Sequence, residues 1–131
     1  MLNLSDNMIK LLIPFILLMS CIPPGKSEKY GLIIAIGDYP ENSGWADLSG
    51  SNDEKIVNET LLSLGFKSDN IYTIRDHEAT KDGILAYFRT LQSKLKEGDI
   101  VYIHYSGHGQ QVIDDNNEEL DKLDEAIVPY D

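Results

Sequence analysis

The chain has 131 residues, about the size of one domain, and its 42% apolar and 25% charged residues are ordinary for a globular protein. Its formal net charge of −11 argues against a nucleic-acid partner, because a polyanion would be repelled. A basic ligand, a bound cation or plain solubility all fit this charge. The single cysteine, Cys21, excludes a disulfide within the chain and a cysteine metal site.

The N-terminus has the layout of an export signal. A lysine precedes an apolar run over residues 11–19, which is too short to span a bilayer. The stretch Leu18–Cys21 also resembles a bacterial lipobox, in which the cysteine is lipidated and becomes the new N-terminus. We therefore predict a signal or lipoprotein signal over residues 1–21 and a short linker over residues 22–29. The expected product is an exported bacterial lipoprotein, anchored to a membrane and facing the periplasm or the cell exterior. A plain signal peptide or an uncleaved anchor is the alternative.

The first half of the remaining chain predicts a strand and then a helix. The run "GLIIAIG", residues 31–37, is typical of a strand that is buried on both faces. After a loop rich in turn-forming residues, "NDEKIVNETLLSLGF" predicts a helix with Asn52 as its N-cap and Gly65 near its end. One face of this helix would carry Ile56, Thr60, Leu61 and Leu64.

The second half continues the alternation. "NIYTIRD", residues 70–76, predicts a strand, and Thr80 is placed to cap the following helix. That helix ends before Gly98, and its apolar stripe consists of Ile84, Phe88, Leu91 and Leu95. "DIVYIHYSG", residues 99–107, predicts a third strand, and "AIVPYD", residues 126–131, a fourth.

Strands that alternate with helices across short links predict βαβ units and therefore a parallel sheet covered by helices. In such sheets ligands bind at the carboxyl ends of the strands. Those ends hold Gly37-Asp38, Asp76-His77 and Gly107-His108-Gly109. The chain ends in or just after a strand that no helix covers, which suggests a fragment or one of two chains cut from a precursor.

The three histidines differ in what they can do. His108 lies between two glycines, which fill no core but allow a sharp turn and the close approach of a substrate, so it is a candidate acid–base group; an exposed histidine in a tight turn is the alternative. His104 lies in mid-strand and is expected to be a satisfied core residue. His77 lies between a strand and a helix and is expected to be solvated.

The acidic stretch from Asp114 to Glu125 offers oxygen ligands of the kind that calcium and magnesium prefer. An EF-hand is excluded because its sixth position would be Glu119 instead of glycine and because no helices flank the loop. A looser cation site and a solvated loop both remain open. No phosphate-binding glycine motif is present, so nucleotide binding has little support.

Five segments, in this order, resemble the large-subunit half of caspase-like cysteine peptidases (clan CD, peptidase C14), with the closest likeness to bacterial metacaspases. They are "GLIIAIGDYP", "LSGSNDEKIVNETLLSLGF", "NIYTIRDHEATKDGI", "GDIVYIHYSGHGQQ" and "LDEAIVPYD". The resemblance implies a peptidase domain over residues 30–131. It also implies a three-layer α/β caspase-hemoglobinase-like fold, mostly a parallel sheet with helices on both faces, incomplete at its C-terminus.

The resemblance also implies roles for particular residues. His108 matches the catalytic histidine of a cysteine–histidine dyad, and the backbone N–H of Gly109 matches an oxyanion-hole donor. Asp53 and Ser106 match residues of the S1 pocket, and an aspartate there would select Arg or Lys at P1. Asp124 matches a calcium ligand of calcium-activated members, so calcium is a possible activator and no other cofactor is expected. The family's usual L-x-G-C-x-N-D is here "LSGSND", one residue shorter and without the cysteine.

The nucleophile is the main departure from the family pattern. The family carries it on the strand after the histidine, in a segment that would lie past Asp131, and Cys21 belongs to the predicted signal. The function expected is cysteine endopeptidase, with a peptide or protein substrate and the missing C-terminal half as partners, a lipid anchor to the membrane, and no activity from this chain alone. The alternative is a non-catalytic, surface-anchored binding module.

Overall fold

The structure, a computed structural model, describes residues 26–116 and 118–131. The predicted export signal over residues 1–21, Cys21 included, lies outside the described residues, so the expected anchor and location stay predictions. Within the ranges that the structure describes, no helix is long and apolar enough to cross a membrane.

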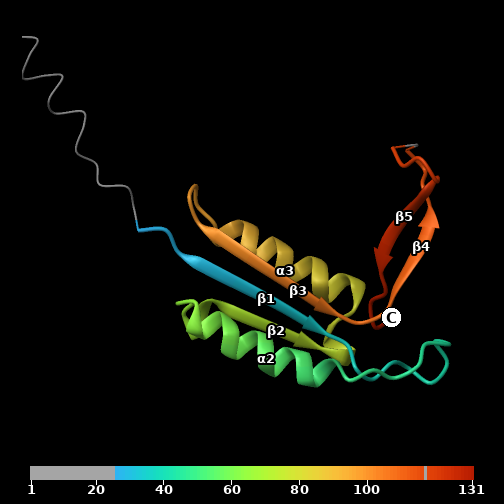
Figure 1. The fold of residues 1–131 in the computed structure, drawn as a ribbon, viewed down its shortest axis with the longest axis horizontal. Helices are drawn as coiled ribbons and strands as arrows, with labels where there is room; N and C mark the ends of the chain where they lie inside the picture. Colours follow the sequence, from blue (N-terminus) through green and yellow to red (C-terminus); the bar gives the residue numbers. More distant parts are fainter. Residues whose placement is uncertain (1–25, 117) are drawn as a thin grey trace, which may run out of the picture.

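A three-stranded parallel sheet forms the centre of the fold (Figure 1). Its strands are β1 (Lys29–Ala35), β2 (Ile71–Arg75) and β3 (Ile100–Ser106), in the order β2-β1-β3. The central strand β1 is buried on both faces from residue 31 onward, as its unbroken apolar run predicts. All three carboxyl ends therefore meet at one edge of the sheet.

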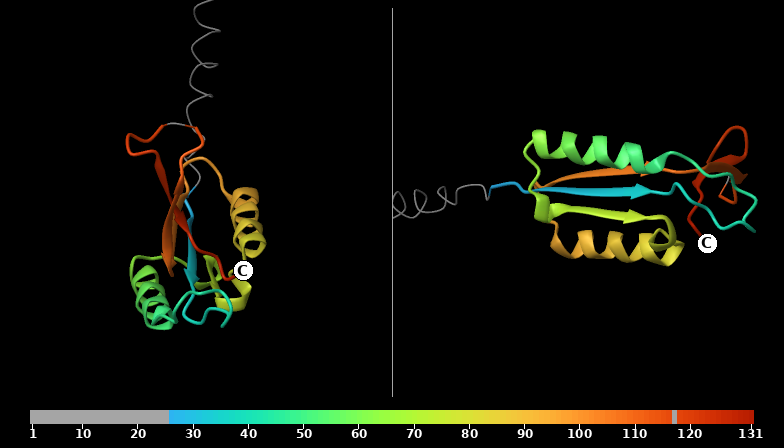
Figure 2. Two further views of the ribbon diagram at one scale, coloured as in Figure 1. Left: turned by 90° about the vertical axis from the view of Figure 1, so that its right-hand side faces the viewer. Right: turned by 90° about the horizontal axis from the view of Figure 1, so that it is seen from below.

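The helices α2 (Gly50–Ser63) and α3 (Lys81–Lys94) cover opposite faces of this sheet (Figure 2). Side chains alternate between the two faces along β1. Ile33 packs with Leu61 on the α2 face, whereas Leu32 and Ile34 belong to the larger cluster on the α3 face. Two short 3₁₀ helices, η1 (Ser68–Asn70) and η2 (Asp76–Glu78), flank β2. The predicted three-layer α/β class with a parallel sheet is confirmed.

Helix α2 differs from its prediction in its start and in its buried face. It begins after Ser49, so the predicted N-cap at Asn52 is wrong. Three members of the predicted stripe are exposed: Ile56, Thr60 and Leu64. The buried face is instead the one that carries Val57 and Leu61, because that face meets Ile33 and Phe66 beneath it.

Helix α3 matches its prediction more closely. The Thr80 hydroxyl accepts the N–H of Gly83 at 3.0 Å, which confirms the predicted N-cap. Ile84 and Leu91 of the predicted stripe are buried, and Leu95 is partly buried against the same cluster. Phe88 is the exception, because its side chain is 36% exposed.

The chain after β3 forms an antiparallel hairpin that stands off the sheet (Figure 1). Its strands are β4 (Gly109–Ile113) and β5 (Leu123–Ile127). The predicted fourth strand over residues 126–131 is therefore wrong in its bounds, and β4 was not expected. Its residues are all exposed, so "GQQVI" carries no core pattern that could reveal a strand.

Candidate active site

Asp76, directly after β2, fixes the start of the loop that follows β1. One oxygen of its carboxylate, Oδ1, accepts the N–H groups of Gly37 at 2.8 Å and Asp38 at 3.1 Å. To reach both, Asp76 adopts a φ of +38°, a region that aspartate tolerates better than most residues. The far end of the loop is fixed by the N–H of Leu48, which donates to the carbonyl of Gly37 at 2.7 Å. The loop thus folds back toward the end of β3.

This loop brings a backbone carbonyl and two aromatic rings to His108. The Nε2 atom of His108 lies 2.7 Å from the carbonyl oxygen of Ala46. A carbonyl can only accept, so the hydrogen bond requires a proton on Nε2 and leaves the lone pair of a neutral ring on Nδ1. The imidazole centroid lies 4.9 Å from that of Trp45 and 5.1 Å from that of Tyr39. These contacts fix the ring in one orientation with Nδ1 as its basic atom.

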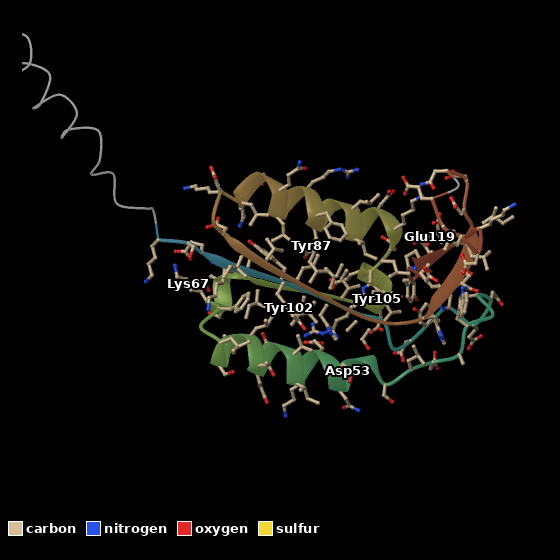
Figure 3. All side chains as sticks on the ribbon, turned by 45° about the horizontal axis from the view of Figure 1, so that its top comes forward. Asp53, Lys67, Tyr87, Tyr102, Tyr105 and Glu119 are labelled. Atoms are coloured by element: carbon tan, nitrogen blue, oxygen red, sulfur yellow. The ribbon has the colours of Figure 1, made fainter. Side chains whose placement is uncertain are left out.

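A serine–carboxylate pair lies beside this histidine, at the same end of the sheet. Ser106, the last residue of β3, donates its hydroxyl proton to Oδ2 of Asp53 at 2.7 Å. Asp53 is exposed and lies in the first turn of α2 (Figure 3). The second carboxylate oxygen, Oδ1, therefore remains available to a positively charged group. The structure thus brings together the two residues that the resemblance assigns to the S1 pocket.

The backbone N–H of Gly109 points away from the hairpin. The N–H of Val128 donates to the carbonyl of His108 at 2.9 Å, so these two residues form a hydrogen-bonded pair at the base of the ladder. Gly109 and Ile127 form the next pair. Bonded and non-bonded pairs alternate in an antiparallel ladder, so the Gly109 N–H is not used by β5. Within the part of the chain that the structure describes it has no acceptor, so it can donate to a group that approaches from the side away from β5.

Three aspartates cluster at the opposite end of the hairpin. Carboxylate oxygens of Asp114, Asp115 and Asp124 all lie within 4.8 Å of one another. Burial raises the pKa of the Asp124 carboxyl, and the charges of Asp114 and Asp115 raise it further. From Gly109 to Asp114 the strand extends about 17 Å, so the cluster is remote from His108. In Figure 3, Glu119 marks the hairpin loop, on the opposite side of the view from Asp53.

The other two histidines do not join this group. His77 lies in η2 and is exposed, as expected. His104 points to the α2 face of β3 and is only partly buried, and its Nε2 has no hydrogen-bond partner among the described residues. The prediction of a satisfied core histidine is therefore wrong in one respect. Among the described residues β3 is an edge strand, with no strand paired beyond it.

Several residues of the site could not be recognised from the sequence. Ala46 contributes only its backbone carbonyl, which leaves no trace in the residue type. For Trp45 and Tyr39 the sequence gives only a weak indication of a role in the site, because large aromatic side chains in a loop are seldom left fully exposed. Asp114 and Asp115 belong to the acidic stretch already noted, but their closeness to Asp124 depends on the hairpin register.

Comparison with known proteins identifies the family. The family model described as "Metacaspase, peptidase C14 domain" matches residues 29–131. Metacaspase-9 of Arabidopsis thaliana is 36% identical over 113 residues, which cover 79% of this chain and 34% of that protein. Metacaspase-1 of Plasmodium falciparum (isolate 3D7) is 32% identical over 115 residues, covering 80% of this chain and 18% of that protein. The chain thus spans about a third or less of the length of these two relatives.

A solved structure shares the fold as well. The crystal structure of protein GSU0716 from Geobacter sulfurreducens superposes with a TM-score of 0.65 at 27% sequence identity, covering 79% of this chain and 40% of that chain. The chain belongs to the metacaspase family of caspase-like cysteine peptidases, peptidase C14.

Proposed function

We propose that this chain supplies the acid–base histidine, an oxyanion donor and the S1 pocket of a cysteine endopeptidase that cleaves after Arg or Lys. The observation that carries the proposal is the fixed ring of His108, with Nε2 bonded to Ala46 and Nδ1 left as the basic atom. A purely structural role would not require a basic ring nitrogen without a bond, whereas an acid–base role at the carboxyl end of a strand does require one.

The chemical roles follow from these positions. Nδ1 of His108 accepts the proton of a cysteine thiol, and the thiolate attacks the carbonyl carbon of the scissile peptide bond. The oxygen of that carbonyl gains negative charge, which the N–H of Gly109 stabilises. The protonated ring then returns its proton to the leaving amine nitrogen, and an acyl-enzyme remains on the sulfur. Water hydrolyses this thioester and regenerates the thiol.

The cysteine has to come from outside the described residues, and β3 offers the place for it. Among the described residues no strand pairs with the outer edge of β3. Its apolar side chains, from Ile100 to Ile103, are exposed there on both faces. A further strand added along this edge would cover them and end beside His108. We propose that this strand carries the nucleophile and that the 131-residue chain has no activity alone.

The specificity for a basic P1 residue rests on Asp53. Its carboxylate already accepts one hydrogen bond from Ser106, which orients it, and the remaining oxygen can pair with a guanidinium or an ammonium group. A charge-assisted contact of this kind contributes about 1.5–3 kcal/mol. Removing the charge should therefore lower kcat/KM for Arg and Lys substrates by about 10- to 150-fold.

The assay compares peptides that carry Arg, Lys or Asp at P1. Two samples are needed: the purified 131-residue chain, and the product of the same coding region with any sequence that follows Asp131. Cleavage after Arg or Lys by the longer product, lost in His108→Ala and reduced in Asp53→Asn, supports the proposal. Glu59→Gln is the matched control, because it removes an exposed carboxylate from the same helix and has no partner among the described residues.

Three outcomes would contradict parts of the proposal. Turnover by the 131-residue chain that disappears in His108→Ala would show that no further strand is needed. Equal cleavage of the Asp peptide would exclude the assigned role of Asp53. Peptide binding without cleavage by the longer product would instead favour a non-catalytic binding module.

Calcium is proposed as an activator that binds the three-aspartate cluster. The donor set fits the ion, because carboxylate oxygens are its preferred ligands; burial raises the pKa of Asp124, and the repulsion from Asp114 and Asp115, which raises it further, is what a cation would relieve. The role of calcium would be to fix the hairpin that carries Gly109. Calcium should raise the melting temperature of wild-type chain at neutral pH but not that of Asp124→Asn, whereas an equal rise in both would exclude this site.

A further inference from the structure

Two tyrosine hydroxyl groups lie between His108 and Val128 at the base of the hairpin. In a regular antiparallel ladder a bonded pair exchanges two N–H···O=C bonds. Here only one of the two is direct, from the N–H of Val128 to the carbonyl of His108. The other is replaced by the hydroxyl of Tyr39, which accepts from the N–H of His108 at 3.0 Å and donates to the carbonyl of Val128 at 3.1 Å.

The second hydroxyl belongs to Tyr105. Its oxygen lies 2.7 Å from the carbonyl oxygens of both His108 and Val128, so its single proton is shared between them. Burial raises the pKa of Tyr105, as does its contact with Tyr39, so the group stays a neutral donor across the physiological range. Tyr39 is buried, and both rings pack in the cluster on the α3 face. We call these two hydroxyls the tyrosine bridge.

The tyrosine bridge also explains the first glycine of the Gly-His-Gly corner. A Cβ atom at Gly107 would lie 2.4 Å from the hydroxyl oxygen of Tyr105 and 3.0 Å from that of Tyr39. A side chain there would require the tyrosine rings or the turn to move. By contrast, a Cβ at Gly109 would meet only the carbonyl oxygen of Ala126 at an ordinary 3.6 Å. The chain therefore turns at residue 107 directly against the tyrosine bridge.

We propose that Tyr39 and Tyr105 are positioning residues for His108, because their hydroxyls replace a ladder bond and thereby set where the His108 backbone leaves β3. This inference rests on the proposed function, since it concerns the histidine assigned to catalysis. The hydroxyl of Tyr39 holds the main chain, and the carbonyl of Ala46 holds the ring. If the main chain shifts by the thickness of a hydroxyl group, the ring loses its partner on Ala46.

The test is spectroscopic and uses the 131-residue chain with ¹⁵N-labelled histidine. Long-range ¹H–¹⁵N NMR reports which ring nitrogen of His108 carries the proton. Wild-type protein should show the Nε2–H form. Tyr39→Phe keeps the ring contact with His108 and removes only the hydroxyl, so the preference for that form should fall by about two- to tenfold, the range that one lost hydrogen bond corresponds to. Tyr102→Phe is the matched control, because its exposed hydroxyl has no hydrogen bond within the described part of the chain.

Tyr105→Phe provides the second variant if Tyr39→Phe does not fold, and it should shift the same signals in the same direction. An unchanged His108 ring spectrum in every folded variant of the two would overturn the inference. The readout needs no turnover, so the two proposals can fail separately. An inactive longer product whose ring signals still respond to Tyr39→Phe would refute the peptidase function and leave the positioning role supported. In an active product, Tyr39→Phe should lower kcat with little change in KM.

Discussion

Replacing Gly107 by alanine is the sharpest test of how the His108 corner is built. The added methyl carbon would lie 2.4 Å from the hydroxyl oxygen of Tyr105 and 2.7 Å from its ring carbon Cζ. Carbon atoms in contact normally keep about 3.5 Å or more, so the ring or the turn must move by about 1 Å. The ring has little freedom to do so, because its hydroxyl is held by two carbonyl groups and the ring packs against the core.

The expected cost combines two terms. Overpacking of this kind costs about 1–3 kcal/mol. Displacing the Tyr105 hydroxyl loses one hydrogen bond, which contributes about 0.5–1.5 kcal/mol. The free energy of unfolding should therefore fall by about 1.5–4.5 kcal/mol in Gly107→Ala. With a urea m-value of about 2 kcal/mol/M, the unfolding midpoint should drop by about 1–2 M.

Gly109→Ala is the matched control on the other side of His108. Its Cβ would make one ordinary contact, and the residue has no positive φ, so the free energy of unfolding should rise by about 0.4–1 kcal/mol instead of falling. Urea unfolding followed by tryptophan fluorescence compares both variants, because Trp45 contacts the His108 ring. Equal stability of the two variants would refute the reasoning, because the tyrosine bridge would then accommodate a methyl group at residue 107 with no loss in the free energy of unfolding.

Two further predictions concern the helix cap and the acidic cluster. Thr80→Ala should lower the free energy of unfolding by about 1 kcal/mol, because the Thr80 hydroxyl accepts the Gly83 N–H. Thr80→Ser keeps a hydroxyl and should retain most of that stability. Equal urea unfolding midpoints for Thr80→Ala and Thr80→Ser would exclude a role for the cap. Asp124 has a raised pKa in the folded state, so its charge opposes folding, and this penalty grows as the pH rises through that pKa. Asp124→Asn should therefore raise the melting temperature at neutral pH and have little effect near pH 3; scanning calorimetry at both pH values checks this, and a larger gain at the acidic pH would contradict it.

The sheet and its covering helices could be predicted because their signals are local. The unbroken apolar run of β1 and the Thr80 cap depend only on residues close together in the sequence, and the structure contains both as predicted. The buried face of α2 could not be predicted in the same way. Val57 and Ile56 are both apolar, and only the position of Ile33 and Phe66 beneath the helix decides which of them faces inward.

The site shows the same division. His108 could be selected from the sequence because glycine on both sides has few other uses at the end of a strand. Its partner on Nε2 could not, because the carbonyl of Ala46 is the same chemical group in every residue. The hairpin could not be predicted from the sequence, because β4 is exposed and its pairing with β5 depends on tertiary contacts instead of a hydrophobic pattern.

The last four residues of the chain attach the hairpin to the body of the fold at separate points. The N–H of Tyr130 donates to the carbonyl of Ala79, and the carboxylate of Asp131 accepts the N–H of Lys81 at the start of α3. The bonds of Tyr130 and Asp131 should open locally at a low free energy, but Val128 is buried in the α3-face cluster and its carbonyl accepts from both tyrosine hydroxyls, so its release requires a costlier local opening. Because Val128 belongs to the same segment and bonds to His108, such an opening would release the histidine while the sheet stays folded. The ordering of His108 would then follow the opening and closing of the segment on a timescale of microseconds to seconds.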